Sequence, residues 1–266
     1  MAKILGMDGG GTKTKAYLFE YEAGKMSEPL KTVTAGPSSL TGSTAEQVYD
    51  NLKSILDQFH LSGEDLAFVG LGTAGISRPD TQTILLELFH KLGIEQALIV
   101  GDQEAALRGA LGKGPGILLI AGTGTIAFGQ HDDHFVRVGG YGHLIDDEGS
   151  GYALGQEILR QTIRVIDGRQ ASTELTRQVM ERLGKGDPQA TLTAIMDICY
   201  TPPFDKSEIA SLAVLLDERI EAGDEDAINI AKEGAKELLL LVETAARNLG
   251  LTKANLVLAG SLLLKS

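Results

Sequence analysis

The residues best suited to chemistry are a few carboxylates that stand beside glycine-rich turns. Asp8 precedes three glycines and Thr12-Lys13-Thr14, and Asp102 follows Gly101 at the start of an alanine-rich segment. Consecutive glycines let backbone N–H groups approach an anion closely, and a neighbouring carboxylate suits a divalent cation. This combination indicates a site that binds phosphate together with a metal ion.

The first turn has a counterpart in the second half of the chain. Gly122-Thr123-Gly124-Thr125 also separates two apolar segments, and a possible third turn lies at Gly260-Ser261. Two such turns would hold a polyphosphate from both sides, and positioning and electrostatics dominate phosphoryl transfer. The repetition is more informative than either turn alone, because an isolated Gly-Thr turn is also an ordinary hairpin connection.

Two familiar phosphate-binding motifs do not fit the first turn. A Walker A loop requires Lys directly after its second glycine, but here Gly6 and Gly11 are followed by Thr12. A dinucleotide-binding fingerprint requires a third glycine where Thr14 stands, followed by a helix. The apolar segments on both sides instead predict a β-hairpin, with a hairpin that binds no ligand as the simpler alternative.

Composition excludes several classes of function. The chain has 266 residues and a net charge of −12, which disfavours binding to nucleic acid or anionic membranes. Its single cysteine, Cys199, excludes an internal disulfide and a cysteine-rich metal site. We see no signal peptide and no apolar run of membrane-spanning length, so we expect a cytoplasmic protein.

The pattern of apolar residues predicts a mixed α/β protein. A capping box formed by Ser43 and Glu46 should start the first helix, and Pro79-Asp80 should open the second. The expected strands are 4–7, 16–21, 30–35, 67–73, 97–100, 117–121, 126–130, 136–138 and 255–258. The expected later helices start near Asp102, Tyr152, Thr173, Ser207 and Asp224.

The order of these elements predicts two domains, 1–115 and 116–266, joined near the 113–116 segment. Each begins with a strand, a glycine turn and a returning strand, and the second carries a helical insertion. The chain stops just after a helix starts at Ser261, so we expect a truncated C-terminal domain.

Six motifs occur in the order seen in one known family. They are DGGGTKT (8–14), GDQEAA (101–106), AGTGT (121–125), GGYGH (139–143), DEGSGY (147–152) and LAGS (258–261). With them the chain resembles the BadF/BadG/BcrA/BcrD-type ATPases and N-acetylglucosamine kinases, within the sugar kinase, Hsp70 and actin superfamily. The resemblance implies two ribonuclease H-like domains, an actin-like ATPase fold, with the active site in the cleft between them.

The resemblance implies an ATP-dependent amino-sugar kinase that uses Mg²⁺ and forms a homodimer, with N-acetylglucosamine, N-acetylmuramic acid or glucosamine as substrate. Asp102, otherwise a helix N-cap, would be the catalytic base, and Asp8, otherwise a turn cap, would hold Mg²⁺ through water. The implied ATP-binding residues are Gly10, Gly11, Thr12, Lys13, Gly122, Thr123, Gly124, Gly260 and Ser261. The implied sugar-binding residues are Ser39, Asp102, Thr125, Ile126, Gly140, Tyr141, Gly142 and Asp147, the last in an acidic run that could also be a solvated loop.

Four positions depart from the family pattern and bear on the identity of the sugar. Tyr141 replaces a frequent Trp, and Asp146 replaces a usual Gly. Ser39 stands where the family often has a substrate-binding Asn, and Ile126 stands where animal N-acetylglucosamine kinases have an Asn. Two amides that would bind particular hydroxyls are therefore missing.

Two other functions compete with the kinase hypothesis. One is an ATP-driven activator of a CoA-ester dehydratase or reductase, which holds an iron–sulfur cluster with two cysteines from each subunit. Cys199 alone cannot supply four thiolates in a dimer. The other is a nucleotide-binding regulator without turnover, which the presence of Asp102 disfavours.

Overall fold

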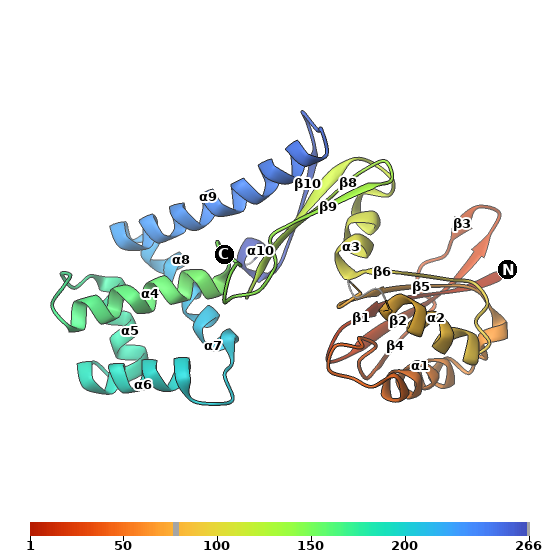
Figure 1. The fold of residues 1–266 in the computed structure, drawn as a ribbon, viewed down its shortest axis with the longest axis horizontal. Helices are drawn as coiled ribbons and strands as arrows, with labels where there is room; N and C mark the ends of the chain where they lie inside the picture. The colour runs from red at the N-terminus through yellow and green to blue at the C-terminus, as the bar shows by residue number, and fades with distance from the viewer. Residues whose placement is uncertain (77–79, 265–266) are drawn as a thin grey trace. The chain divides into compact units, whose positions relative to one another are not determined.

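The computed structural model describes residues 1–76 and 80–264. The chain divides into two compact units, Met1–Ala110 and Leu111–Ser266. Each unit has its own sheet and its own buried core, and each is described by itself. Figure 1 gives the labels of the helices and strands.

The first unit is built on a mixed sheet in the strand order β3-β2-β1-β5-β6, with β4 also paired to β2. Its strands are β1 (Ala2–Gly9), β2 (Thr14–Glu22), β3 (Lys25–Met26), β4 (Lys31–Ala35), β5 (Leu66–Thr73) and β6 (Ala97–Gly101). β1, β2 and β4 form the predicted antiparallel meander, and β5 and β6 continue it in parallel. This is the predicted ribonuclease H-like sheet, with the short β3 as the unpredicted addition.

Helices cover both faces of this sheet. α1 (Ala45–Phe59) and α2 (Thr81–Lys91) lie on one side and α3 (Asp102–Leu111) on the other (Figure 1). The core on the α1 and α2 side is the largest apolar cluster of the unit. Its fully buried members include Leu5, Val69, Leu71, Ile55 and Phe89.

The start of α1 differs from the prediction by one residue. Thr44, not Ser43, is the N-cap: its hydroxyl accepts a hydrogen bond from the Gln47 N–H at 3.2 Å, and the Gln47 side chain accepts one from the Thr44 N–H at 3.0 Å. The sequence Ser-Thr-Ala-Glu-Gln contains two overlapping capping boxes, and the apolar period fits either. At α2, Asp80 is the N-cap, while Pro79 lies outside the described residues.

The second unit begins with an antiparallel hairpin. Its sheet runs in the order β10-β7-β8-β9, with β7 (Gly116–Ala121), β8 (Thr125–His131), β9 (His134–Val138) and β10 (Asn255–Ala259). β10 is parallel to β7. The amide of Gln130 on β8 donates to the carbonyls of Gly112 at 2.8 Å and Gly114 at 2.6 Å, so β8 fixes the segment that precedes β7.

The rest of the second unit is helical, as predicted. Its helices are α4 (Gly151–Ile166), α5 (Glu174–Gly184), α6 (Pro188–Tyr200), α7 (Lys206–Ala210), α8 (Val214–Glu221), α9 (Glu225–Asn248) and α10 (Ser261–Leu264). α6 was not predicted, although Asp187 caps it and Pro188 opens it, a common N-terminal signal. None of the helices in the described part of the chain is long and apolar enough to span a membrane.

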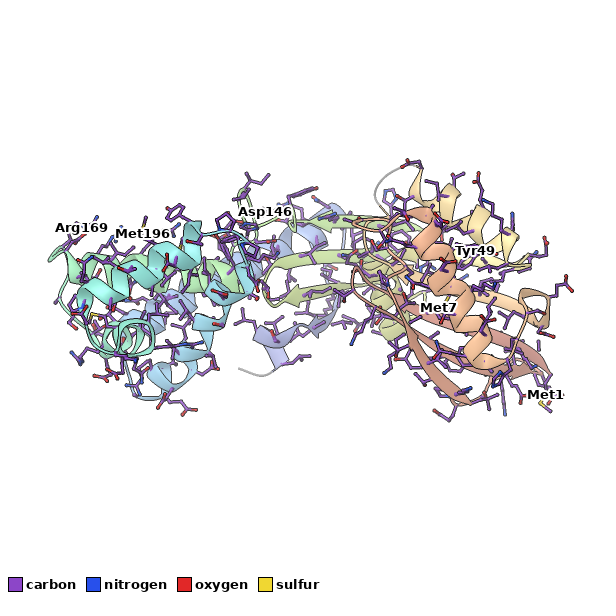
Figure 2. All side chains as sticks on the ribbon, turned by 90° about the horizontal axis from the view of Figure 1, so that it is seen from below. Met1, Met7, Tyr49, Asp146, Arg169 and Met196 are labelled. Atoms are coloured by element: carbon purple, nitrogen blue, oxygen red, sulfur yellow. The ribbon has the colours of Figure 1, made fainter. Side chains whose placement is uncertain are left out.

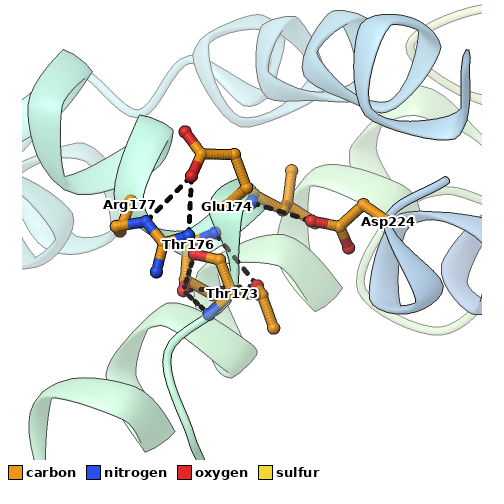
Figure 3. A network of polar contacts seen from close by, with 6 residues as sticks. Thr173, Glu174, Thr176, Arg177 and Asp224 are labelled. Carbon is orange, nitrogen blue, oxygen red and sulfur yellow. Dashed lines mark hydrogen bonds and ion pairs between the residues drawn. The ribbon is translucent and has the colours of Figure 1, made fainter. Parts of the chain in front are cut away.

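One carboxylate joins two of these helices (Figure 3). Asp224 caps α9 through one oxygen, which accepts the Ala227 N–H at 3.2 Å, and its other oxygen accepts the Leu175 N–H at 3.1 Å. Thr173 and Thr176 form the cap of α5 itself. Because free N–H groups at helix starts need acceptors, Asp224 satisfies both helices and fixes α5 against α9.

The corrected cap of α1 leads to a first prediction. Thr44→Ala should lower the free energy of unfolding by about 1 kcal/mol, because it removes the hydroxyl that accepts the Gln47 N–H at the start of the helix. Ser43→Ala is the matched control and should change it by less than about 0.5 kcal/mol. Urea unfolding followed by circular dichroism measures both. A larger loss for Ser43→Ala would restore the original assignment.

Candidate functional site

The first glycine turn (Gly10–Lys13) closes the β1–β2 hairpin, where Gly9 pairs with Thr14. The Gly10 N–H donates to the Lys13 carbonyl at 2.9 Å, which fixes the shape of the turn. Gly11, Thr12 and Lys13 are exposed, and a side chain at Gly11 would meet nothing within 4 Å. The backbone of this turn is therefore open to a ligand, as the sequence predicts.

Asp8 and Asp102 lie at the carboxyl ends of strands β1 and β6, on the same face of the first sheet. Asp8 is exposed near the end of β1, in register with Gly72 of β5, and Asp102 is the first residue of α3, directly after β6. A Cβ at Gly72 would lie 2.5 Å from the Ala105 Cβ and 3.9 Å from the Asp102 Cα. The start of α3 therefore lies over the strand next to Asp8, and this helix start favours a negative charge at Asp102.

Ser39 lies beside the first glycine turn, but its hydroxyl is used within the chain. It donates to the Ala74 carbonyl at 2.9 Å and accepts the Thr41 N–H at 3.2 Å, and the residue is buried. The Ser39 N–H points to the Gly10 carbonyl at 3.4 Å. The backbone thus brings the segment around this predicted sugar-binding residue, residues 36–41, to the turn; this segment is called the acceptor loop below.

The second glycine turn (Gly122–Thr125) joins β7 to β8 and lies against the start of α4. The Gly122 N–H donates to the Gly124 carbonyl at 3.0 Å, and the Gly151 N–H of α4 donates to the Gly122 carbonyl at 2.7 Å. α4 has 16 residues and is capped by Ser150. The N-terminus of such a helix attracts anions, which is consistent with the prediction that this turn binds phosphate.

The third turn, Gly260-Ser261, lies next to the second because β10 pairs with β7. Gly260 has a φ of 93°, and a Cβ there would come within 2.2 Å of the Ala121 carbonyl oxygen. The Ser261 hydroxyl oxygen is 3.6 Å from the position that a Gly122 Cβ would take. The predicted ATP-binding residues of the second unit are therefore brought together.

These turns form one wall of a cavity of about 290 Å³. The other wall comes from α7, α8 and the residues between them, and includes Ser207, Ser211, Val214 and Asp217. Sequence analysis missed these residues, because they lie in a helical stretch without a motif. The cavity presents hydroxyl groups, a carboxylate and apolar surface beside the second glycine turn.

The 139–147 segment is shaped by glycines and one carboxylate. Gly139, Gly140 and Gly142 have φ values of 70°, 78° and 103°. The carboxylate of Asp146, which is labelled in Figure 2, accepts the Tyr141 N–H at 2.9 Å. The Arg137 guanidinium lies 4.8 Å from the centre of the Tyr141 ring and donates to the Gly139 and Gly140 carbonyls. Tyr141 itself is 66% exposed, so its ring is available to a ligand.

Asp147 connects this segment to the second glycine turn. Its side chain is buried, so the alternative of a solvated loop is wrong for this residue. The carboxylate accepts the Thr125 N–H at 3.3 Å and lies within 2.9 Å of where a Gly124 Cβ would be. Thr125 also donates to the Glu148 carbonyl at 3.0 Å, while Ile126 is buried beneath Gly140.

His143 and Cys199 have packing roles. The His143 ring is 4.9 Å from the Tyr152 ring and 5.4 Å from the Phe204 ring, as expected for a residue that packs. Cys199 packs on the helical core, and burial raises the pKa of its thiol. Among residues 1–76 and 80–264, no three His, Cys, Asp or Glu side chains form a group that could hold a metal ion.

Comparisons with known proteins agree with this arrangement. The profile of the BadF/BadG/BcrA/BcrD ATPase family matches residues 5–266. An N-acetylmuramic acid/N-acetylglucosamine kinase of Clostridium acetobutylicum is 32% identical over 97% of this chain and 84% of its own length. An N-acetyl-D-glucosamine kinase of Dictyostelium discoideum is 28% identical over 94% of this chain and 81% of its own length.

A solved structure is also similar. A putative N-acetylglucosamine kinase from Chromobacterium violaceum superimposes with a TM-score of 0.72, at 27% identity, over 98% of this chain and 88% of that one. The fold is thus the actin-like ATPase fold of sugar kinases, as predicted. The chain belongs to the BadF/BadG/BcrA/BcrD ATPase family.

The close approach at the third turn leads to a second prediction. Gly260→Ala should lower the free energy of unfolding by at least about 2 kcal/mol, because the new Cβ collides with a backbone carbonyl at positive φ. Gly250→Ala is the matched control: its φ is 66°, but its Cβ would meet nothing within 4 Å. It should cost about 1 kcal/mol. Equal losses in urea unfolding would contradict a steric role for Gly260.

Proposed function

We propose that this protein is an ATP-dependent kinase that phosphorylates a hydroxyl of an amino sugar. The proposal rests mainly on Asp102, which stands at the start of α3 on the face and edge of the sheet that also carry Asp8 and the first glycine turn. The names of the relatives support N-acetylglucosamine or N-acetylmuramic acid as the sugar, with glucosamine as a further candidate.

The residues present suit ATP and Mg²⁺. The N–H groups of Gly10 and Gly11, with Thr12 and Lys13, would bind phosphate oxygens, and Gly122, Thr123, Gly124 and Ser261 would bind them in the second unit. The exposed carboxylate of Asp8 fits Mg²⁺, which is commonly held by one carboxylate, phosphate oxygens and water. When bound, Mg²⁺ neutralises charge on the phosphates.

Asp102 would accept the proton of the attacking sugar hydroxyl. Phosphoryl transfer has a loose transition state, so alignment of the hydroxyl matters more than the strength of the base. Tyr141 and the backbone of Gly140 and Gly142 would orient the sugar, while Asp147 and Thr125 hold that segment in place. That both units contribute to one site stays a prediction.

Replacing the base is the direct test. Asp102→Asn should lower the sugar-dependent rate of ADP release about 10²–10⁴-fold, because the amide cannot accept the proton. Nucleotide binding, measured by calorimetry, should stay near wild type. Glu104→Gln is the matched control on the same helix turn, where Glu104 pairs with Arg108 at 2.8 Å, and it should keep most of the activity. Retained turnover in Asp102→Asn would refute the assignment.

The sugar itself can be identified by a coupled ADP-release assay over a panel of amino sugars. We expect the highest kcat/KM for N-acetylglucosamine or N-acetylmuramic acid, with glucosamine next. Phosphorus NMR of the product then identifies the hydroxyl that is phosphorylated. No ADP release above background with any amino sugar would argue against the proposed substrate class.

The iron–sulfur activator remains the alternative from the same family. Such a dimer needs two cysteines from each subunit, and this sequence has one. A colourless preparation without iron would eliminate it. We also propose a cytoplasmic homodimer, and light scattering of the purified protein at several concentrations tests the oligomeric state.

A further inference from the structure

Three hydroxyl side chains meet beneath the first glycine turn, on the sheet face opposite Asp8. Gly9 pairs with Thr14 of β2 on one side and with Thr73 of β5 on the other. Neighbours in register point to the same face of a sheet, about 5 Å apart. Gly9 has no side chain, and the Ser38 hydroxyl oxygen occupies its place, 2.1 Å from where a Gly9 Cβ would be.

Two of these hydroxyls are buried without a partner. Thr14 and Ser38 are completely inaccessible to solvent, and neither hydroxyl has a hydrogen bond among the described residues. Thr73 is equally buried, and its hydroxyl donates to the Ala74 carbonyl over a long distance of 3.5 Å. Buried hydroxyls without a partner are rare because each costs free energy.

We propose that Thr14, Ser38 and Thr73 form a binding site for one buried water molecule. Neither Thr14 nor Ser38 pairs with another hydroxyl of the group, although the Ser38 and Thr73 oxygens lie 2.1 and 3.2 Å from one point, the place of a Gly9 Cβ. A single water can bridge polar groups gathered in this way. A buried water typically makes about three hydrogen bonds, the number that these side chains offer. No charged side chain belongs to the cluster, which suits a neutral ligand.

This water would position the two loops that the proposed function requires. Ser38 lies in the acceptor loop next to Ser39, whose N–H points to Gly10, and Thr14 ends the first glycine turn. The Ala74 N–H donates to the Gly9 carbonyl at 3.2 Å, so Thr73 belongs to the same assembly. The hydroxyls therefore act as positioning residues; this consequence, unlike the water site itself, rests on the proposed function.

The water site is tested by unfolding, which needs neither ATP nor sugar. Thr14→Val keeps the shape of the side chain and removes its hydroxyl. If a water satisfies that hydroxyl, Tm should fall by about 2–4 °C. If the hydroxyl has no partner, its removal should leave Tm unchanged or raise it, and the proposal is overturned. Thr32→Val, at an exposed position on β4, is the control and should not change Tm.

A double-mutant cycle sharpens the result. Ser38→Ala should lower Tm by a similar amount, and the combined Thr14→Val and Ser38→Ala variant should lose less than the sum, because both changes release the same water. Strict additivity would contradict a shared ligand. A crystal structure that resolves water should show one molecule within hydrogen-bond distance of at least two of the three hydroxyls, and an empty site would refute the proposal.

The positioning role has a separate readout. Thr14→Val should raise KM for ATP and for the sugar about three- to tenfold while kcat stays within about twofold, since Asp102 is untouched. Thr14→Ser restores the hydroxyl and should return both KM values to near wild type. If no amino sugar is phosphorylated, the proposed function fails, while the unfolding experiments still decide whether the water is bound. Unchanged KM values in an active enzyme would refute the positioning role.

Discussion

The structure depends on close backbone approaches that only glycine permits, placed where strands end. At Gly72, α3 packs against the sheet closely enough that a Cβ would overlap Ala105. At Gly260, the last turn packs against the carbonyl of Ala121. These contacts bring Asp102 to the edge of the first sheet and Ser261 to the second glycine turn. A side chain at either position would separate groups that phosphate chemistry needs side by side.

In each unit a loop is held beside a glycine turn, but the hydrogen bonds that hold it differ between the two units. In the first, the Ser39 N–H ties the acceptor loop to the glycine turn, and the Ser39 hydroxyl ties it to the Ala74 carbonyl after β5. In the second, the buried carboxylate of Asp147 receives the Thr125 N–H and joins the 139–147 segment to its turn. In both units, one residue contacts a glycine turn and also holds a loop that we predict to bind ligand. A change in that loop should therefore also alter the glycine turn.

The sequence was sufficient to predict the features that depend on neighbouring residues, such as hairpins and helix starts. Apolar alternation located both hairpins, and the step from β6 into an alanine-rich helix located Asp102. Long-range packing could not be predicted from the sequence. The burial of Asp147, and the cavity that Ser207 and Asp217 line with Gly122, depend on contacts between distant segments. The α1 cap was misplaced for a third reason, since two capping boxes overlap and the apolar period fits both.

Two of the four departures from the expected family motif, Tyr141 and Asp146, lie in one turn and contact each other. The Asp146 carboxylate accepts the N–H of Tyr141; the motif resemblance implies Gly and Trp at these two positions. Arg137 covers the smaller ring and binds the carbonyls of the same turn. The turn is thus held from both sides, by an acceptor and by a donor. Arg137 lies over one side of the Tyr141 ring, but the residue is 66% exposed, so part of its aromatic surface stays open for a sugar to contact.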